Sequence, residues 1–178
     1  HCLPWALNFE KERTMSLNTL EEIANYIVSD GKGILAADES NPTCGKRFDS
    51  IGVESTEINR RDYREMLFRA SGMQDNIGGV ILFDETIRQS AEDGTPLIEL
   101  IKNQGALPGI KVDKGLAPLE SSPEETVTQG LDGLDERCRE YVSIGAKFTK
   151  WRAVIKISAS LPTDECIKAN MQALAKYA

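Results

Sequence analysis

The sequence predicts an α/β protein in which parallel strands alternate with helices. Four short runs of the chain are almost continuously apolar, which is typical of strands that are covered on both faces. Segments with apolar residues at every third or fourth position lie between these runs and indicate amphipathic helices. Glycines follow most of the helical segments, where they commonly end a helix. The four predicted strands are residues 33–38, 79–83, 109–113 and 148–156.

The first half of the chain begins with a capping box. Thr19 and Glu22 have the spacing at which a helix starts, and Gly31 ends this helix before the first strand. A second helix ends at Gly72, before the second strand. The expected apolar residues are Leu20, Ile23, Ile27 and Val28 in the first helix and Tyr63, Met66, Leu67 and Ala70 in the second.

The second half repeats this alternation. Thr95 and Pro96 mark the start of a third helix, and Gly105 marks its end. A fourth helix ends at Gly145, and a fifth follows Pro162. The expected apolar faces are Leu97, Leu100 and Ile101 in the third helix, Leu134, Cys138, Tyr141 and Val142 in the fourth, and Ile167, Met171 and Leu174 in the fifth. Strands and helices thus alternate along the chain as they do in βα units.

Four βα units with right-handed crossovers fit either half of a (β/α)8 barrel or part of a doubly wound sheet. No GxGxxG motif follows the first strand, which disfavours a dinucleotide-binding sheet. The segment Gly31-Lys32-Gly33 also lacks the spacing of a phosphate loop. We therefore expect a (β/α)8 TIM barrel, of which this chain covers about the first four βα units.

The domain is expected to comprise residues 15–178. Residues 1–14 show no clear period, and we interpret them as an extension that is either upstream or vector-derived. The last helix has no Gly, Asn or Pro that would end it. This favours a protein that continues beyond Ala178.

The composition argues against several classes of protein. No run approaches the roughly 18 apolar residues of a membrane-spanning helix, which argues against a transmembrane protein. Lys and Arg number 21 against 28 Asp and Glu, a net charge of −7, which argues against nucleic acid and anionic membranes as partners. The four cysteines are scattered without a CxxC pair, and the only histidine is His1. We therefore expect neither a disulfide framework nor a metal site. The scattered cysteines are typical of the reduced thiols of a cytosolic protein, and we expect a cytoplasmic location.

Charged residues at the ends of the predicted strands form the candidate site. Lys150 and Arg152 lie two positions apart on the fourth strand and share a face. Lys111 lies on the third strand, and Asp38 closes the first. In barrels the carboxyl ends of the strands hold the catalytic groups, so these four side chains are expected to converge. Three cations and one carboxylate suit a phosphorylated, oxygen-rich substrate, and an internal set of salt bridges is the structural alternative.

Five segments in the same order resemble class I fructose-bisphosphate aldolase. They are residues 31–40 (GKGILAADES), 77–83 (IGGVILF), 109–115 (GIKVDKG), 128–134 (TQGLDGL) and 150–152 (KWR). The resemblance extends from about Leu20 to Ala178 and covers the N-terminal half of that family's barrel. It implies reversible cleavage of fructose 1,6-bisphosphate into dihydroxyacetone phosphate and glyceraldehyde 3-phosphate in glycolysis, through a lysine Schiff base and without a metal or other cofactor. A homotetrameric full-length enzyme is also implied.

The resemblance further implies roles for individual residues. Asp38 would contact the substrate hydroxyls and support proton transfer, and Lys150 and Arg152 would orient the substrate and stabilise oxyanion charge. The implied substrate-binding residues are Arg47, Lys111, Ser40, Thr43 and Arg60. Of these, Ser40, Thr43 and Arg47 are expected in a phosphate-binding loop after the first strand.

The same resemblance places the Schiff-base lysine and the main acid–base glutamate of the family on the sixth and fifth strands, which are not in this chain. The chain alone is therefore expected to be inactive. A noncatalytic half-barrel scaffold or interaction module is the alternative function.

Overall fold

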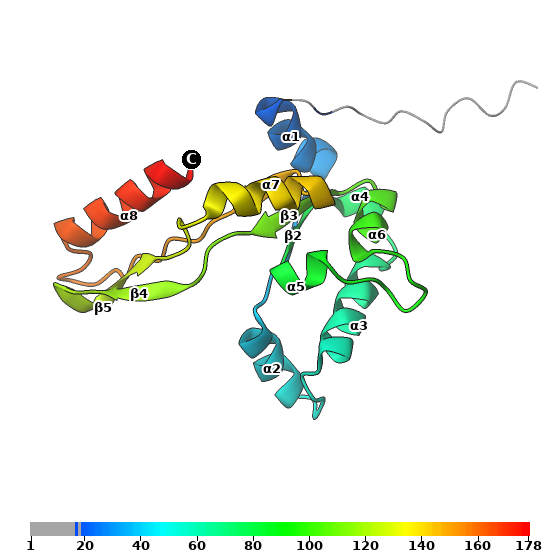
Figure 1. The fold of residues 1–178 in the computed structure, drawn as a ribbon, viewed down its shortest axis with the longest axis horizontal. Coiled ribbons are helices and arrows are strands. Elements are labelled where there is room, and N and C mark those ends of the chain that lie inside the picture. The colour runs from blue at the N-terminus through cyan, green and yellow to red at the C-terminus, as the bar shows by residue number, and fades with distance from the viewer. Residues whose placement is uncertain (1–16, 18) are drawn as a thin grey trace, which may run out of the picture.

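The computed structural model describes residue 17 and residues 19–178, and its centre is a four-stranded sheet (Figure 1). The strands are β1 (Gly33–Ala37), β2 (Ile77–Leu82), β3 (Leu107–Lys111) and β6 (Phe148–Lys150). They lie in the order β1-β2-β3-β6, and every neighbouring pair is parallel. The predicted alternation of βα units is thus confirmed. The expected boundary between residues 1–14 and 15–178 lies outside the described residues.

All five predicted helices are present. They are α1 (Leu20–Ile27), α3 (Glu57–Phe68), α6 (Leu97–Asn103), α7 (Leu134–Ile144) and α8 (Asp164–Tyr177). The capping box forms as predicted, because Thr19 Oγ1 accepts the Glu22 N–H at 3.1 Å and Glu22 Oε2 accepts the Thr19 N–H at 3.0 Å. Three short turns of helix also occur: η1 (Ser29–Gly31), α4 (Met73–Asn76) and α5 (Asp84–Ile87).

The core lies where the sheet packs against α3, α6 and α7. Val80, Leu82 and Ile110 of the strands are completely buried, together with Phe68 of α3 and Ile101 of α6. Five residues that were expected on the apolar faces of the first, second and fourth predicted helices are instead exposed: Leu20, Val28, Met66, Ala70 and Val142. The buried stripes of α1, α3 and α7 are therefore narrower than the sequence pattern predicts.

A helix, α2 (Asn41–Asp49), replaces the loop that was expected after the first strand. Ser40 is its N-cap residue in an extended conformation, and Pro42 lies in the first turn, where its missing N–H is tolerated. Cys44 and Phe48, four residues apart, are buried by the helix, and this packing stabilises it. The residues expected in a loop but found at or on this helix are Ser40, Thr43 and Arg47.

A β-hairpin that the sequence pattern did not predict follows β3. Its strands, β4 (Leu116–Leu119) and β5 (Ser122–Thr128), are antiparallel. The predicted strand over residues 148–156 ends already at Lys150, which lies opposite Lys111 at the end of β3. Because β3 leads into the hairpin, the chain after Lys150 has no neighbouring strand with which to continue the sheet.

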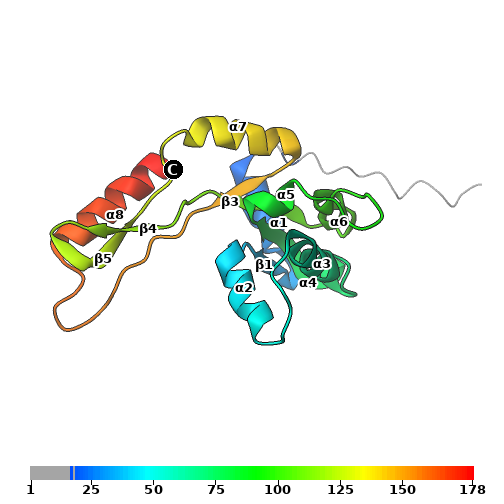
Figure 2. The same cartoon turned by 60° about the horizontal axis from the view of Figure 1, so that its bottom comes forward.

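Helix α8 packs on the hairpin with a face other than the one expected. Cys166, Asn170 and Ala173 are buried, whereas Ile167 and Met171 are exposed. The reason is that α8 packs mainly on β5, where Asn170 Nδ2 donates to the Thr126 carbonyl at 2.9 Å. Only the last turn of α8 reaches the central sheet, through the Tyr177 hydroxyl, which lies 2.6 Å from the Thr149 hydroxyl of β6. The hairpin and α8 lie together at one end of the molecule, away from α3 and α6 (Figures 1 and 2).

Candidate active site

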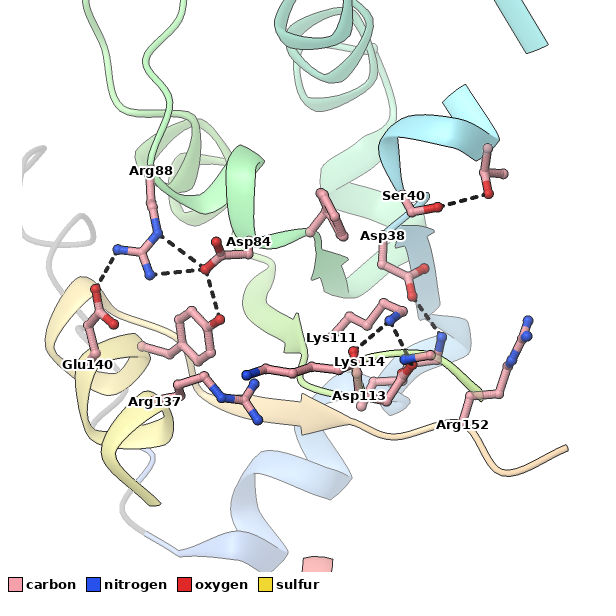
Figure 3. Close-up of a pocket in the computed structure, with 15 residues that line it drawn as sticks. Asp38, Ser40, Asp84, Arg88, Lys111, Asp113, Lys114, Arg137, Glu140 and Arg152 are labelled. Atoms are coloured by element: carbon pink, nitrogen blue, oxygen red, sulfur yellow. Dashed lines mark hydrogen bonds and ion pairs between the residues drawn. The ribbon is translucent and has the colours of Figure 1, made fainter. Parts of the chain in front are cut away.

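A pocket of about 790 Å³ lies at the carboxyl ends of the parallel strands (Figure 3). The residues that end or follow the strands contribute to its wall. Asp38 follows β1, Phe83 follows β2, Lys111 ends β3 and Lys150 ends β6. Arg152, two residues beyond Lys150, also lines the pocket. The structure thus brings together the four charged side chains that strand alternation placed on one face.

An ion pair joins the first and last strands of the sheet. Lys150 Nζ lies 2.7 Å from Asp38 Oδ2, and these side chains are 28% and 12% exposed. Two strands separate β1 from β6, which corresponds to about 14 Å across a flat sheet. The contact therefore depends on a sheet that curves as a barrel wall does, and it holds the Lys150 ammonium group in the pocket.

A second lysine lies beside the first. Lys111 and Lys150 are register partners on β3 and β6, so their side chains enter the pocket from adjacent strands. Lys111 Nζ donates to Asp113 Oδ1 at 2.7 Å and to the Asp113 carbonyl at 2.8 Å. The Asp113 side chain is almost completely buried, and this contact limits where the Lys111 ammonium group can move.

Three cations of the pocket have no carboxylate partner among the described residues: Lys114, Arg137 and Arg152. The Arg152 backbone is fixed, because the Thr128 hydroxyl at the end of β5 donates to the Arg152 carbonyl at 2.7 Å. The hairpin thereby positions a pocket residue. Trp151 points away and packs against the core, as strand alternation predicts. An unpaired guanidinium at a pocket wall suits a phosphate group.

The remaining predicted substrate-binding residues divide into two groups. Ser40 and Thr43 line the pocket, and their hydroxyl oxygens lie 3.1 Å apart. Arg47 and Arg60 are not part of the pocket wall. Arg47 pairs with Glu39, and Arg60 donates two hydrogen bonds of 2.7 Å to the Glu85 carboxylate. The structure therefore brings Ser40 and Thr43 to the pocket and places both arginines in ion pairs outside it.

The Arg60–Glu85 pair predicts a measurable pH dependence of stability. Hydrogen bonds from Arg60 lower the pKa of the Glu85 carboxyl below its usual value. The pair therefore stabilises the fold fully above the unfolded-state pKa of about 4.3, and this contribution is lost as the pH falls through the lower folded-state pKa. We expect Glu85→Gln to lower the free energy of unfolding by about 2 kcal/mol at pH 7 and to make it less dependent on pH below about 4.3.

Urea unfolding of the Glu85→Gln variant between about pH 3 and pH 7 measures this effect. Glu54→Gln is the control, because Glu54 is an exposed carboxylate just before α3. Parallel stability curves for wild type and Glu85→Gln over the whole pH range would contradict the prediction.

A further wall of the pocket escaped the sequence analysis because its residues lie on helices. Tyr141 on α7 donates to Asp84 Oδ1 at 2.8 Å, and Arg88 forms ion pairs with Asp84 and with Glu140 (Figure 3). Burial raises the pKa of Asp84, but the hydrogen bonds from Arg88 and Tyr141 outweigh burial and lower it. Asp84 could have been found, since it follows the end of the second strand much as Asp38 follows the first.

Arg137 of α7 completes this wall. Its guanidinium donates to the carbonyl of Val112 at 3.0 Å and to that of Gly130, which fixes α7 against the segments just before and just after the hairpin. Burial, followed by the hydrogen bond to Asp84, raises the pKa of the Tyr141 hydroxyl. This hydroxyl is therefore a stable hydrogen-bond donor at neutral pH.

No group of three or more His, Cys, Asp or Glu side chains in residues 17 and 19–178 is arranged to hold a metal ion. No helix of the same residues has the length and apolar character needed to cross a membrane.

The curved parallel sheet and the charged pocket at the ends of its strands define a protein of the (β/α)8 barrel class. Comparison with known proteins then gives the family. The family model described as fructose-bisphosphate aldolase class-I matches residues 19–178, and the chain belongs to this family.

Individual relatives agree with the family assignment. The chain is 53% identical over 164 residues to a probable fructose-bisphosphate aldolase class 1 of Xanthomonas campestris, covering 92% of this chain and 49% of the relative. It is 53% identical over 174 residues to fructose-bisphosphate aldolase C of Carassius auratus, covering 97% and 47%. The chain thus spans about half the length of the curated relatives it matches.

A solved structure supports the barrel fold. Fructose-bisphosphate aldolase of Plasmodium falciparum, in a complex with TRAP and a small-molecule inhibitor, superimposes with a TM-score of 0.85 at 50% sequence identity. The match covers 88% of this chain and 46% of that chain. The expectation that the chain covers about four βα units of the barrel is thus confirmed.

Proposed function

We propose that this chain forms the substrate-orienting part of the active site of a glycolytic fructose-bisphosphate aldolase. The observation that carries the proposal is the Asp38–Lys150 pair, which holds a carboxylate and an ammonium group in one pocket beside the unpaired Arg152. The substrate would be fructose 1,6-bisphosphate, and the products would be dihydroxyacetone phosphate and glyceraldehyde 3-phosphate.

Each of these charged groups has a distinct task in carbon–carbon cleavage. Arg152 and Lys111 bind phosphate and hydroxyl oxygens, and their positive charges orient the substrate. Lys150 stabilises the negative charge that develops on oxygen as the bond breaks. Asp38 accepts a hydrogen bond from a substrate hydroxyl and can exchange a proton with the neighbouring Lys150 ammonium group.

Ser40 and Thr43 bind a phosphate group through their hydroxyls in this proposal. Both lie in the first turn or at the N-cap of α2, where backbone N–H groups also favour an anion. Arg47 and Arg60, which the family resemblance assigns to the substrate, would act less directly, since each is held by a carboxylate outside the pocket.

The direct test is an assay of the complete enzyme that contains this sequence. Cleavage of fructose 1,6-bisphosphate is followed by coupling the triose phosphates to a dehydrogenase, with fructose 1-phosphate and fructose as comparison substrates. We expect the bisphosphate to have the highest kcat/KM, because its two phosphates meet the cations of the pocket. Equal kcat/KM for fructose and the bisphosphate would overturn the proposal.

In our proposal, the lysine that forms the Schiff-base imine with the substrate is not one of the lysines of this chain. We expect the 178-residue chain to form no covalent adduct when it is treated with borohydride and dihydroxyacetone phosphate, as judged by intact mass. The complete enzyme should gain one adduct per chain under the same treatment. A stable adduct on Lys111 or Lys150 of the 178-residue chain would show that this assignment is wrong.

We also propose a cytoplasmic location and a homotetrameric complete enzyme. The location is supported by the relative named fructose-bisphosphate aldolase 5, cytosolic, of Arabidopsis thaliana, which is 53% identical over 159 residues. The tetramer rests on the resemblance to the family, and sedimentation velocity of the complete enzyme tests it.

A further inference from the structure

Two arginines on one face of α3 hold the turn that connects β1 to α2. Arg60 and Arg64 are four residues apart, so their side chains lie on the same side of the helix. Helices α2 and α3 lie side by side (Figures 1 and 2). Phe48 of α2 and Tyr63 of α3 are in edge-to-face contact at 5.7 Å, which confirms that the helices pack together.

Arg64 is the more deeply buried of the two, with 2% of its side chain exposed. Its Nη2 donates to the Glu39 carbonyl at 3.0 Å and lies 3.0 Å from Glu39 Oε2. Its Nη1 contacts the Cys44 sulfur at 3.4 Å. Glu39 is the residue between Asp38 and Ser40, both of which line the pocket. A single guanidinium therefore holds the backbone between two pocket residues.

Arg60 holds the same turn from its other side. Its guanidinium forms two hydrogen bonds to Glu85, and Glu85 Oε2 accepts a third from Asn41 Nδ2 at 3.3 Å. Asn41 is the first residue of α2. The chain from Glu39 to Asn41 is thus fixed at both ends by arginines of α3.

A buried guanidinium destabilises the fold unless carboxylates, carbonyls or other acceptors satisfy it. Here its Nη2 meets the Glu39 carbonyl and carboxylate and its Nη1 meets the Cys44 sulfur, whereas its Nε has no hydrogen-bond partner among the described residues. Its planar fork allows little displacement of the groups it binds. The turn therefore has one well-defined position, in which Asp38 reaches Lys150 Nζ at 2.7 Å and the Ser40 hydroxyl faces the pocket (Figure 3).

We propose that Arg64 is a positioning residue of the active site, which sets the Asp38 carboxylate and the Ser40 hydroxyl relative to Lys150 and is assisted by Arg60. Arg64 does not line the pocket, so it acts through Glu39 and not on the substrate. The catalytic part of this inference rests on the proposed aldolase function. The geometric part, namely that Arg64 fixes the turn from Asp38 to Ser40, does not depend on that function. The two parts are tested separately.

The geometric test uses the 178-residue chain. The amide groups of Thr43 and Cys44 both donate to the Ser40 carbonyl at 2.9 Å, so their hydrogen exchange reports on the turn. We expect Arg64→Lys to accelerate exchange of these two amides about tenfold relative to that of Leu82 in the core, and to shift the NMR resonance of Lys150 Nζ. Arg61→Lys, on the same helix but paired with Asp62 and not with the turn, should change neither quantity.

The catalytic test is a double-mutant cycle in the complete enzyme. We expect Arg64→Lys to lower kcat about tenfold in the wild-type background. In the Asp38→Asn background, the same substitution should lower kcat by less than about twofold. A residue that only stabilises the fold would lower kcat by the same factor in both backgrounds, and that result would overturn the catalytic part.

The two tests separate the possible failures. Unchanged exchange of Thr43 and Cys44 together with an unchanged Lys150 resonance would overturn the positioning role itself. A complete enzyme that cleaves no fructose 1,6-bisphosphate, with altered exchange and an altered Lys150 resonance in Arg64→Lys, would contradict the aldolase proposal and support the geometric role of Arg64.

Discussion

Replacing Lys150 with methionine in the complete enzyme is expected to lower kcat for fructose 1,6-bisphosphate cleavage about 10²-fold, with the fold retained. Methionine keeps most of the apolar stem and removes only the charge. The ammonium group lies in the pocket, 2.7 Å from Asp38 Oδ2 and partly shielded from water, where a positive charge acts strongly on developing oxyanion charge. Steady-state kinetics and a thermal melt of the same preparation measure the two quantities.

A matched lysine provides the control. Lys46 is an exposed residue of α2 outside the pocket wall, and Lys46→Met should leave kcat within about twofold. The salt-bridge interpretation of Lys150 predicts the opposite pattern, namely a lower melting temperature with kcat changed by no more than a few-fold. In that case the Asp38–Lys150 pair would serve the barrel wall and not the reaction.

Replacing Gly78 with alanine is expected to be the most destabilising single-methyl change in this chain. A Cβ at this position would lie 2.1 Å from the Ile27 carbonyl oxygen and 2.7 Å from the Ile27 carbonyl carbon. Both are backbone atoms at the end of α1, so no side chain can rotate to make room. We expect a loss of about 3 kcal/mol, or roughly 6–12 °C in melting temperature for a chain of this size.

Gly33 is the matched control for this substitution. It also lies in the parallel sheet, directly opposite Ile77 at the start of β2, but a Cβ there would have no atom within 4 Å. Gly33→Ala should change the free energy of unfolding by less than about 0.5 kcal/mol. Equal stability of the two variants in urea unfolding would show that α1 can shift away from β2 without cost.

Strand alternation and the position of strand ends predicted from the sequence that four charged side chains would lie together: Asp38, Lys111, Lys150 and Arg152. Lys111 and Lys150 line the pocket because parallel strands end at one edge of the sheet. Arg152 lies beyond the end of β6 and still faces the pocket, with its carbonyl held by the Thr128 hydroxyl. Asp38 follows from the same argument on strand ends, since it comes directly after a buried strand. These are local rules, which hold wherever the strand itself is correctly identified.

The ion pairs of Arg47, Arg60 and Arg64 could not be predicted in the same way. The family resemblance assigns Arg47 and Arg60 to the substrate, and in the structure each forms an ion pair. Arg47 pairs with Glu39 of the adjacent turn, and Arg60 pairs with Glu85 from a distant part of the chain. An ion pair between Arg60 and Glu85 joins residues 25 positions apart, and no spacing rule connects them. Arg64, whose guanidinium is buried against Glu39, carries no sequence signal that separates it from Arg61, which is only half-buried.

The sequence by itself determined that βα units follow one another along the chain, where the five main helices lie and which charged residues lie at the strand ends. These features could be predicted because periodicity and capping are local properties of the chain. Only the tertiary structure decided that residues 41–49 are helical, that residues 116–128 form a hairpin and that α8 buries Cys166, Asn170 and Ala173. These features depend on which surfaces meet: α2 on α3, and α8 on β5. The same curvature of the sheet brings Asp38 to Lys150 across two intervening strands, a contact between residues 112 positions apart that no local pattern encodes.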